Sequence, residues 1–148
     1  MLLIAGKIHD SDYCNYIRKL CEKNNKIVLL DYVSDIEKVW LFLNASLLVS
    51  TSSSEGFGIP VLDAACLNLP VLGSNIASHL EIKNLTKSKN IILLDIRDEK
   101  TWIRHLNELK IFDKENENNK FLRIENFKNS LESLEHESLV KIKRLMSS

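Results

Sequence analysis

The sequence predicts an α/β domain of three layers, in which a parallel sheet lies between helices. Short apolar runs alternate with amphipathic stretches through most of the chain, and this alternation is typical of strand–helix–strand units with right-handed crossovers. Leu47, Leu48 and Val49 are apolar without alternation, as expected of a strand that is covered on both faces. A polar loop and a helix opened by Pro60 follow this strand. These features favour a parallel sheet over an antiparallel one.

Short apolar runs predict the strands of the sheet. Small or polar residues follow most of these runs and lead the chain out of the core. The runs are residues 2–5, 27–30, 47–49, 71–72 and 91–94. Because helical stretches join them, we expect the strands to run parallel to one another.

Helices are predicted wherever apolar residues recur at helical spacing. The predicted helices are residues 12–23, 35–44 and 59–67, a short helix within 75–83, and residues 98–109 and 121–146. Asp10 or Ser11 is the expected cap of the first helix. Ser34 is the expected cap of the second, with Glu37 completing a capping box.

Apolar stripes predict which helical side chains face the core. The stripes comprise Tyr13, Tyr16, Ile17, Leu20 and Cys21, then Val39, Trp40, Phe42 and Leu43, and finally Trp102, Ile103, Leu106 and Leu109. We expect Trp40 and Trp102 to anchor the core, because large aromatic side chains bury much apolar area.

The loop after residue 49 has the features of a ligand site. Its small polar residues, Ser50 to Ser54, leave the core at the carboxyl end of a strand, where open α/β sheets place their ligands. Gly56 and Gly58 permit positive φ or close approach of the backbone to a ligand. Pro60 suits the first turn of a helix. The alternative is an ordinary polar loop with turn glycines.

Two acidic residues bracket this loop and its helix. Backbone N–H groups at a helix N-terminus attract phosphate, but Glu55 and Asp63 would repel it and are better suited to accept hydrogen bonds from sugar hydroxyls. A ligand that has both phosphates and sugar hydroxyls is a nucleotide-sugar. Alternatively, Asp63 is an acidic residue in the first turn of a helix that binds no ligand and is favoured there by the helix dipole.

The segment SEGFGIPVLDAACLNLPVLGSNIASHLEI, residues 54–82, resembles the signature segment of retaining glycosyltransferases with the GT-B fold, of the group 1 or family 4 type. That family carries two glutamates separated by seven residues, the first opening an EGFG loop. Gly6 after a strand, and DYVS at residues 31–34, also match the family's layout. The resemblance covers residues 2–82 and implies a Rossmann-like domain, equivalent to the C-terminal, donor-binding half of the fold.

The resemblance also implies roles for individual residues. Glu55 would be the catalytic residue and contact the donor sugar, and Asp63 would hold the ribose hydroxyls. The implied substrate-binding residues are Gly56, Phe57, Gly58, Ile59, Asp63, Ser54, Lys7 and Val33. The implied reaction transfers a hexose from a nucleotide-diphosphate sugar to a saccharide or lipid-linked acceptor, with no cofactor and no metal. No DxD metal motif is seen.

The chain departs from the family pattern at several places. Asp63 stands for a glutamate and is one methylene shorter, Asp31 stands where the family often has glycine, and His79-Leu80-Glu81 lacks the usual proline. The family's basic pair, which neutralises the diphosphate, would lie upstream of the first residue, and Lys7 does not match its position. We therefore expect a fragment or truncated relative that lacks the N-terminal GT-B domain and is inactive in isolation.

Composition excludes several other classes of protein. The 148 residues include 20 basic and 20 acidic side chains, so no electrostatic footprint for nucleic acid is present. No apolar run reaches the length of a membrane-spanning helix, and the first residues lack the basic start of a signal peptide. Three widely spaced cysteines fit reduced thiols. We expect a cytoplasmic protein, with peripheral association to the membrane as the alternative.

Residues 1–112 are expected to form the nucleotide-sugar-binding domain and residues 113–148 a helical extension. Two alternatives to an enzyme remain open: an inactive or regulatory nucleotide-sugar-binding module, and a remnant that docks on a partner. His79 and Glu81 are two residues apart on a helix and do not face each other, so we do not expect them to form an acid–base pair.

Overall fold

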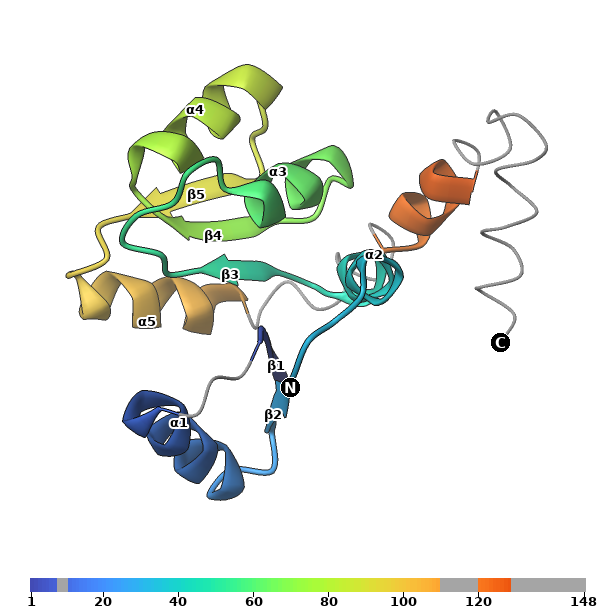
Figure 1. The fold of residues 1–148 in the computed structure, drawn as a ribbon. Helices are drawn as coiled ribbons and strands as arrows, with labels where there is room; N and C mark the ends of the chain where they lie inside the picture. Colours follow the sequence, from blue (N-terminus) through green and yellow to red (C-terminus); the bar gives the residue numbers. More distant parts are fainter. Residues whose placement is uncertain (8–10, 110–119, 129–148) are drawn as a thin grey trace. The chain divides into compact units, whose positions relative to one another are not determined.

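The computed structural model describes residues 1–7, 11–109 and 120–128. It confirms the predicted α/β class, because every pair of strands is parallel and helices join them (Figure 1). The chain divides into two compact units between Trp40 and Leu41, and each unit is described by itself. Most of the expected helical extension, residues 113–119 and the part of the predicted helix beyond residue 128, lies outside the described residues.

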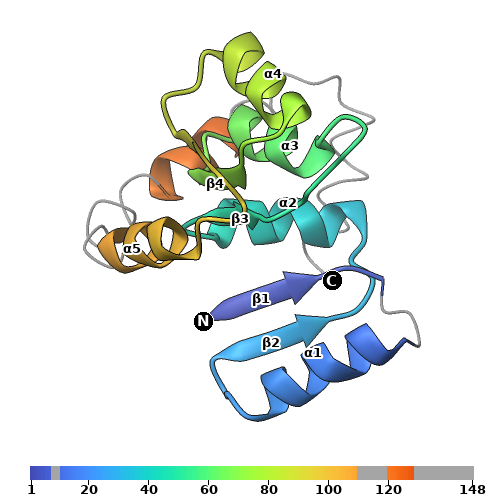
Figure 2. The ribbon, with the colours of Figure 1, turned by 90° about the vertical axis from the view of Figure 1, so that its left-hand side faces the viewer.

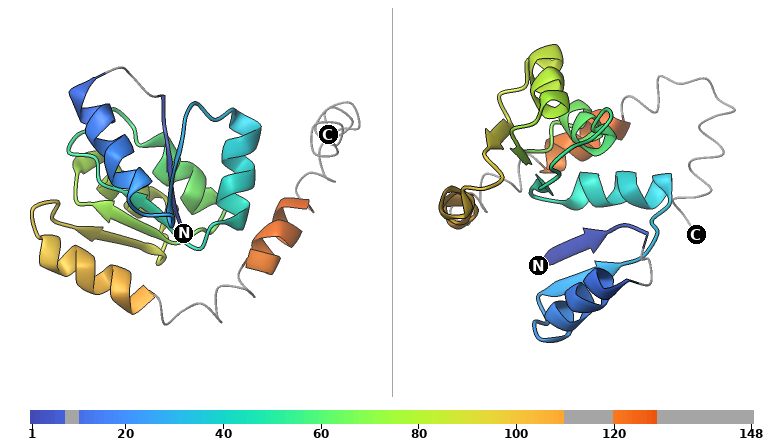
Figure 3. Two further views of the ribbon diagram at one scale, coloured as in Figure 1. Left: turned by 90° about the horizontal axis from the view of Figure 1, so that it is seen from below. Right: turned by 60° about the vertical axis from the view of Figure 1, so that its left-hand side comes forward.

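The first unit is a strand–helix–strand element. It holds β1 (Leu2–Ala5), α1 (Asp12–Glu22) and β2 (Ile27–Leu30). The two strands pair in parallel, with Leu2 opposite Ile27 and Ala5 opposite Leu30, and α1 runs alongside them (Figure 3). Ser11 caps α1, as expected for one of the two candidate caps, because its hydroxyl accepts the N–H of Cys14 at 3.2 Å.

A capping box opens α2 (Asp35–Asn44). The Glu37 carboxylate accepts from the Ser34 N–H at 2.8 Å and from the Ser34 hydroxyl at 2.7 Å, and the Glu37 N–H donates to that hydroxyl at 3.4 Å. The predicted box is therefore confirmed. These hydrogen bonds, the one from the Ser34 hydroxyl above all, lower the pKa of Glu37 from its ordinary value because they favour the ionised carboxylate.

The second unit carries a three-stranded parallel sheet in the order β3-β4-β5. Its elements are β3 (Leu48–Ser50), α3 (Ile59–Cys66), β4 (Val71–Ser74), α4 (Ala77–Thr86), β5 (Ile91–Leu94) and α5 (Glu99–Leu109), followed by a helix at residues 120–128. α3 and α4 lie on one side of the sheet and α5 lies on the other (Figure 1). This arrangement agrees with the predicted layers.

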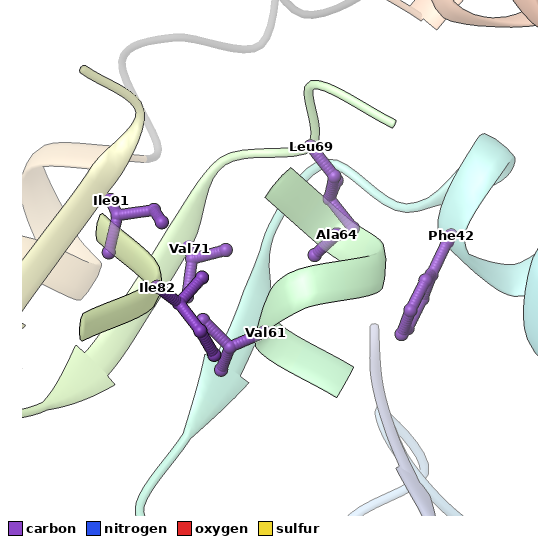
Figure 4. Close-up of a cluster of buried hydrophobic side chains, with 7 residues drawn as sticks. All are labelled: Phe42, Val61, Ala64, Leu69, Val71, Ile82 and Ile91. Carbon is purple, nitrogen blue, oxygen red and sulfur yellow. The ribbon is translucent and has the colours of Figure 1, made fainter. Parts of the chain in front are cut away.

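The core of this unit lies between β4, α3 and α4. Every residue of β4 is buried, whereas β3 is only partly buried. The strand covered on both faces is therefore β4 and not β3, because β4 is the central strand and β3 is at the edge of this sheet. The buried cluster in Figure 4 comprises Phe42, Val61, Ala64, Leu69, Val71, Ile82 and Ile91.

Several predicted core residues are exposed instead. Trp40 is 59% exposed, so its predicted role as a core anchor is wrong, whereas Trp102 is buried and its indole N–H donates to the Asp95 carbonyl at 2.9 Å. Other members of the predicted stripes are exposed too: Tyr13, Tyr16, Leu20, Ile103 and Leu106. Helical periodicity identifies an apolar face, but it does not say whether a neighbour is wide enough to cover that face.

The helix at residues 120–128 is held to the second unit by Arg123. This side chain is 4% exposed, and its Nη2 donates to the Ala45 carbonyl at 2.7 Å, 78 positions earlier in the chain. Burial lowers the pKa of Arg123 from its ordinary value. Within the described residues, no helix is long and apolar enough to cross a membrane.

Candidate functional site

The candidate site is the loop that joins β3 to α3. After Ser50 the chain runs out from the carboxyl end of β3 and returns at Gly58, where α3 begins (Figure 2). Parallel α/β sheets place their ligands at this edge. The loop contains most of the residues that the sequence pattern singles out.

Gly58 sets the geometry at the start of α3. Its φ of 79° and ψ of 42° are left-handed, and a side chain is strained there. A Cβ atom at Gly58 would also lie 3.1 Å from Ile82 Cδ1 and 3.2 Å from His79 Cδ2. Gly56 is different, since a Cβ atom there would meet no atom within 4 Å. The sequence predicts that Gly56 and Gly58 allow either a positive φ or close approach of the backbone to a ligand. Of these two glycines, only Gly58 has a positive φ.

Glu55 is held by a serine on its own loop. The Ser52 hydroxyl donates to Glu55 Oε1, and the Ser52 carbonyl in turn accepts the hydroxyl of Ser74 at the end of β4. The Glu55 side chain keeps 23% of its surface exposed. Its carboxylate is therefore oriented by the protein and still open to a ligand.

His79 lies directly behind Glu55. Its side chain is fully buried on α4, and its Nε2 lies 3.8 Å from Glu55 Oε2 and 3.5 Å from the Ser50 hydroxyl oxygen. Its Nδ1 lies 2.9 Å from the Ser74 carbonyl oxygen. A carbonyl only accepts, so Nδ1 carries a proton and donates. The sequence-based reasoning missed this partner, because it tested His79 only against its helical neighbour Glu81.

The remaining residues of the loop face solvent to different degrees. Phe57 and Ile59 are 51% and 57% exposed, and Ser54 is exposed. Asp63 is partly buried on α3, four residues after Ile59 and so about one turn further along the same face. Exposed apolar side chains on the same loop as the oriented Glu55 carboxylate suit the two surfaces of a sugar ring, which carries both C–H and O–H groups.

Lys7 and Val33 belong to the other unit. Lys7 follows β1 and Val33 follows β2, so both lie at the carboxyl edge of that strand pair. Lys7 is exposed and Val33 is partly buried. The structure thus brings Ser54 through Ile59 and Asp63 together in the second unit, and it places Lys7 and Val33 in the first.

The chemistry of this loop is that of binding through hydrogen bonds. Glu55 offers carboxylate oxygens as acceptors, and Gly58 provides no side-chain cap to α3. Pro60 has no N–H, and the Val61 N–H donates to the Gly58 carbonyl at 2.9 Å. The Ile59 N–H is therefore the donor that this first turn offers to an anion. A helix N-terminus of this kind attracts anions. In the part of the chain that the structure describes, no group of three or more histidine, cysteine, aspartate or glutamate side chains could hold a metal ion.

Several known proteins share sequence with this chain. The family model described as Glycosyl transferases group 1 matches residues 1–122. The chain is similar to the O-antigen chain mannosyltransferase RfbU of Salmonella typhimurium, 32% identical over 105 residues that make up 69% of this chain and 28% of that protein. It is also similar to the serotype-specific mannosyltransferase WbdA of Escherichia coli, 35% identical over 83 residues, which are 55% of this chain and 10% of that protein. No solved structure matches.

The matched stretches therefore cover only 28% of RfbU and 10% of WbdA. The match to the family model includes the loop from Ser50 to Gly58 and both described units up to residue 122.

Proposed function

Because the chain belongs to the group 1 glycosyltransferases, we propose that its β3–α3 loop binds the donor of a glycosyl transfer, a nucleotide-diphosphate sugar. In this proposal Glu55 is the catalytic residue and contacts the sugar. The backbone of Gly56, Phe57, Gly58 and Ile59 meets the sugar and the diphosphate. Asp63, one turn into α3, accepts hydrogen bonds from the ribose hydroxyls.

The observation that carries this proposal is the state of the Glu55 carboxylate. It is held from one side by Ser52 and it keeps part of its surface open, beside the uncapped N-terminus of α3. A carboxylate that is oriented in advance binds hydroxyl groups without the entropic cost of ordering its side chain. Donors for a phosphate and acceptors for hydroxyls thus lie in one loop.

We propose that the transferred sugar is a hexose. Mannose is the first candidate, because the relatives named above are mannosyltransferases. The acceptor is proposed to be a saccharide or a lipid-linked saccharide. Residues 1–112 would form the donor-binding domain and residues 113–148 a helical extension. A further domain of the GT-B type would supply the acceptor site and the cations that neutralise the leaving diphosphate.

Calorimetric titration of the chain with GDP-mannose, UDP-glucose, GDP and UDP tests the proposal. We expect Glu55→Ala to weaken binding of the nucleotide-sugar about tenfold and to leave the bare nucleotide unaffected, as for one lost hydrogen bond to a charged group. Asp63→Ala should weaken both ligands, because both contain ribose. Glu108→Ala, an exposed glutamate on α5, is the control and should change neither affinity.

Absence of binding to every nucleotide would overturn the proposed donor site. Equal effects of Glu55→Ala and Glu108→Ala would show that the carboxylate does not touch the sugar.

A further inference from the structure

A closed ring of contacts links four residues, Ser52, Glu55, His79 and Ser74. The Ser52 hydroxyl donates to Glu55 Oε1, and Glu55 Oε2 faces His79 Nε2 at 3.8 Å. His79 Nδ1 donates to the Ser74 carbonyl at 2.9 Å, and the Ser74 hydroxyl returns to the Ser52 carbonyl. The ring joins the loop, the end of β4 and the start of α4, so its members come from three separate segments of the chain.

The slot that holds His79 is shaped by two glycines. A Cβ atom on Gly73 would lie 3.3 Å from His79 Nδ1 and 3.2 Å from Leu93 Cδ2, and a Cβ atom on Gly58 would lie 3.2 Å from His79 Cδ2. Both distances to the imidazole are shorter than a comfortable van der Waals contact. A side chain at either position would therefore crowd the ring of His79 and require it or its surroundings to shift by a few tenths of an ångström.

The two edges of the imidazole have different partners. Nδ1 is committed to a backbone carbonyl, and Nε2 is left to face the carboxylate and the Ser50 hydroxyl. The Ser50 hydroxyl, at 3.5 Å, is the nearer of these two groups, and Glu55 Oε2, at 3.8 Å, is the charged one. Nε2 donates to the carboxylate only when it carries a proton in addition to the one on Nδ1, because a bare ring nitrogen and a carboxylate are both acceptors. Hydrogen bonds at ligand sites are often long before the ligand binds and shorten in the complex, so 3.8 Å is compatible with a direct contact in the bound state.

We propose that His79 is a positioning residue, which fixes the Glu55 carboxylate through its Nε2 edge for contact with the donor sugar. The inference rests on the proposed function of Glu55 and adds to it the group that orients that carboxylate. Ser52 holds one carboxylate oxygen and His79 the other, so the plane of the carboxylate is set from both sides. With only one of these partners the carboxylate would rotate about its terminal bond, which has a broad energy minimum.

Two amide replacements separate the two edges of the imidazole. In His79→Gln the amide N–H reaches roughly where Nε2 lies, and in His79→Asn it reaches roughly where Nδ1 lies. The measured quantity is sugar preference, the dissociation constant of the bare nucleotide divided by that of its nucleotide-sugar. His79→Gln should keep this preference within about threefold of the native value, and His79→Asn should reduce it about tenfold, the usual effect of losing a hydrogen bond to a charge.

His105 provides a matched control. Its Nδ1 also contacts a backbone carbonyl oxygen, that of Thr101 at 2.9 Å, but it lies on α5 and faces no carboxylate in the described contacts. His105→Gln and His105→Asn should leave sugar preference unchanged. The positioning role is overturned if His79→Gln and His79→Asn reduce the sugar preference equally, or if His79→Asn preserves it. His79 would then contribute only packing.

A spectroscopic measurement works without any ligand. Long-range proton–nitrogen correlation of the labelled protein should show His79 protonated on both Nδ1 and Nε2, and Glu55→Gln should shift the Nε2 resonance of His79 while leaving that of His105 unchanged. A His79 protonated on one ring nitrogen only, or an Nε2 resonance that does not change in Glu55→Gln, would overturn the proposal. Failure to bind any nucleotide with these spectra as expected would instead count against the proposed function and leave the ring of contacts established.

Discussion

Replacement of Gly58 by alanine tests the geometry of the site most directly. The left-handed conformation of Gly58 costs an L-residue about 1–2 kcal/mol. The added methyl group would also lie 3.1–3.3 Å from Ile82 Cδ1, His79 Cδ2 and Glu55 Oε2, and overpacking of this kind costs about 1–3 kcal/mol. We therefore expect the free energy of unfolding to fall by about 2–5 kcal/mol in Gly58→Ala, since these two costs add.

Urea unfolding followed by circular dichroism measures this loss. For a domain of this size the slope of stability against urea is about 1–3 kcal/mol per molar, so the midpoint should fall by on the order of 1 M or more. The slope itself should stay unchanged, because the same surface is exposed on unfolding.

Two other glycines divide the effect into its parts. Gly56→Ala adds a methyl group into open space, and we expect a change within about 0.5 kcal/mol. Gly73→Ala has close contacts, with Leu93 Cδ2 at 3.2 Å and His79 Nδ1 at 3.3 Å, but no positive φ, so it reports overpacking alone. If Gly58→Ala costs no more than Gly73→Ala, the backbone strain assigned to Gly58 is refuted. If it costs no more than Gly56→Ala, both parts of the reasoning are refuted.

Three further predictions concern stability elsewhere in the chain. Leu72→Ala, at a position 1% exposed on β4, should lower the free energy of unfolding by about 2–5 kcal/mol in urea titrations. Hydrogen bonds, chiefly from the Thr101 hydroxyl, lower the folded-state pKa of Asp98 below its ordinary 3.8; its stabilisation is thus complete above that value and lost as pH falls through the lower folded-state pKa. The stability deficit of Asp98→Asn should accordingly shrink between pH 7 and strongly acidic solution. Arg123→Ala removes the donor to the Ala45 carbonyl, and amide exchange in residues 120–128 should quicken about tenfold or more.

Each of these has a contrary outcome. A loss below about 1 kcal/mol in Leu72→Ala would mean that its face of β4 is loosely packed, with Leu72→Met as the volume-conserving control. A deficit of Asp98→Asn that is independent of pH would show that the carboxylate charge does not cap α5. Unchanged exchange in Arg123→Ala, with Lys128→Ala as an exposed control, would mean that the helix is held by other contacts.

Local interactions explain which elements could be predicted from the sequence. The capping box of Ser34 and Glu37 depends on residues three apart, and the structure has it as predicted. The cap at Ser11 and the apolar strands β1, β2 and β5 depend on equally short stretches. Gly58 and Pro60 mark the loop-to-helix junction for the same reason, since conformational preference is a property of each residue.

The burial of helical faces could not be predicted in the same way. Trp40 and Trp102 occupy similar apolar stripes, yet Trp40 is 59% exposed and Trp102 is 7% exposed. Trp102 is covered within its own unit and its indole finds the Asp95 carbonyl. An apolar stripe shows that burial would be favourable, whereas the arrangement of neighbouring elements decides whether burial occurs.

The family and the candidate loop could be predicted from the sequence, because a loop signature is a contiguous run of residues. The partner of Glu55 could not be predicted in this way. His79 lies 24 positions away, and it meets the carboxylate only because β4 leads into α4 beside the carboxyl end of β3. Spacing along the chain determines local structure through short-range hydrogen bonds, while contacts between the ends of different strands depend on how the whole sheet pairs.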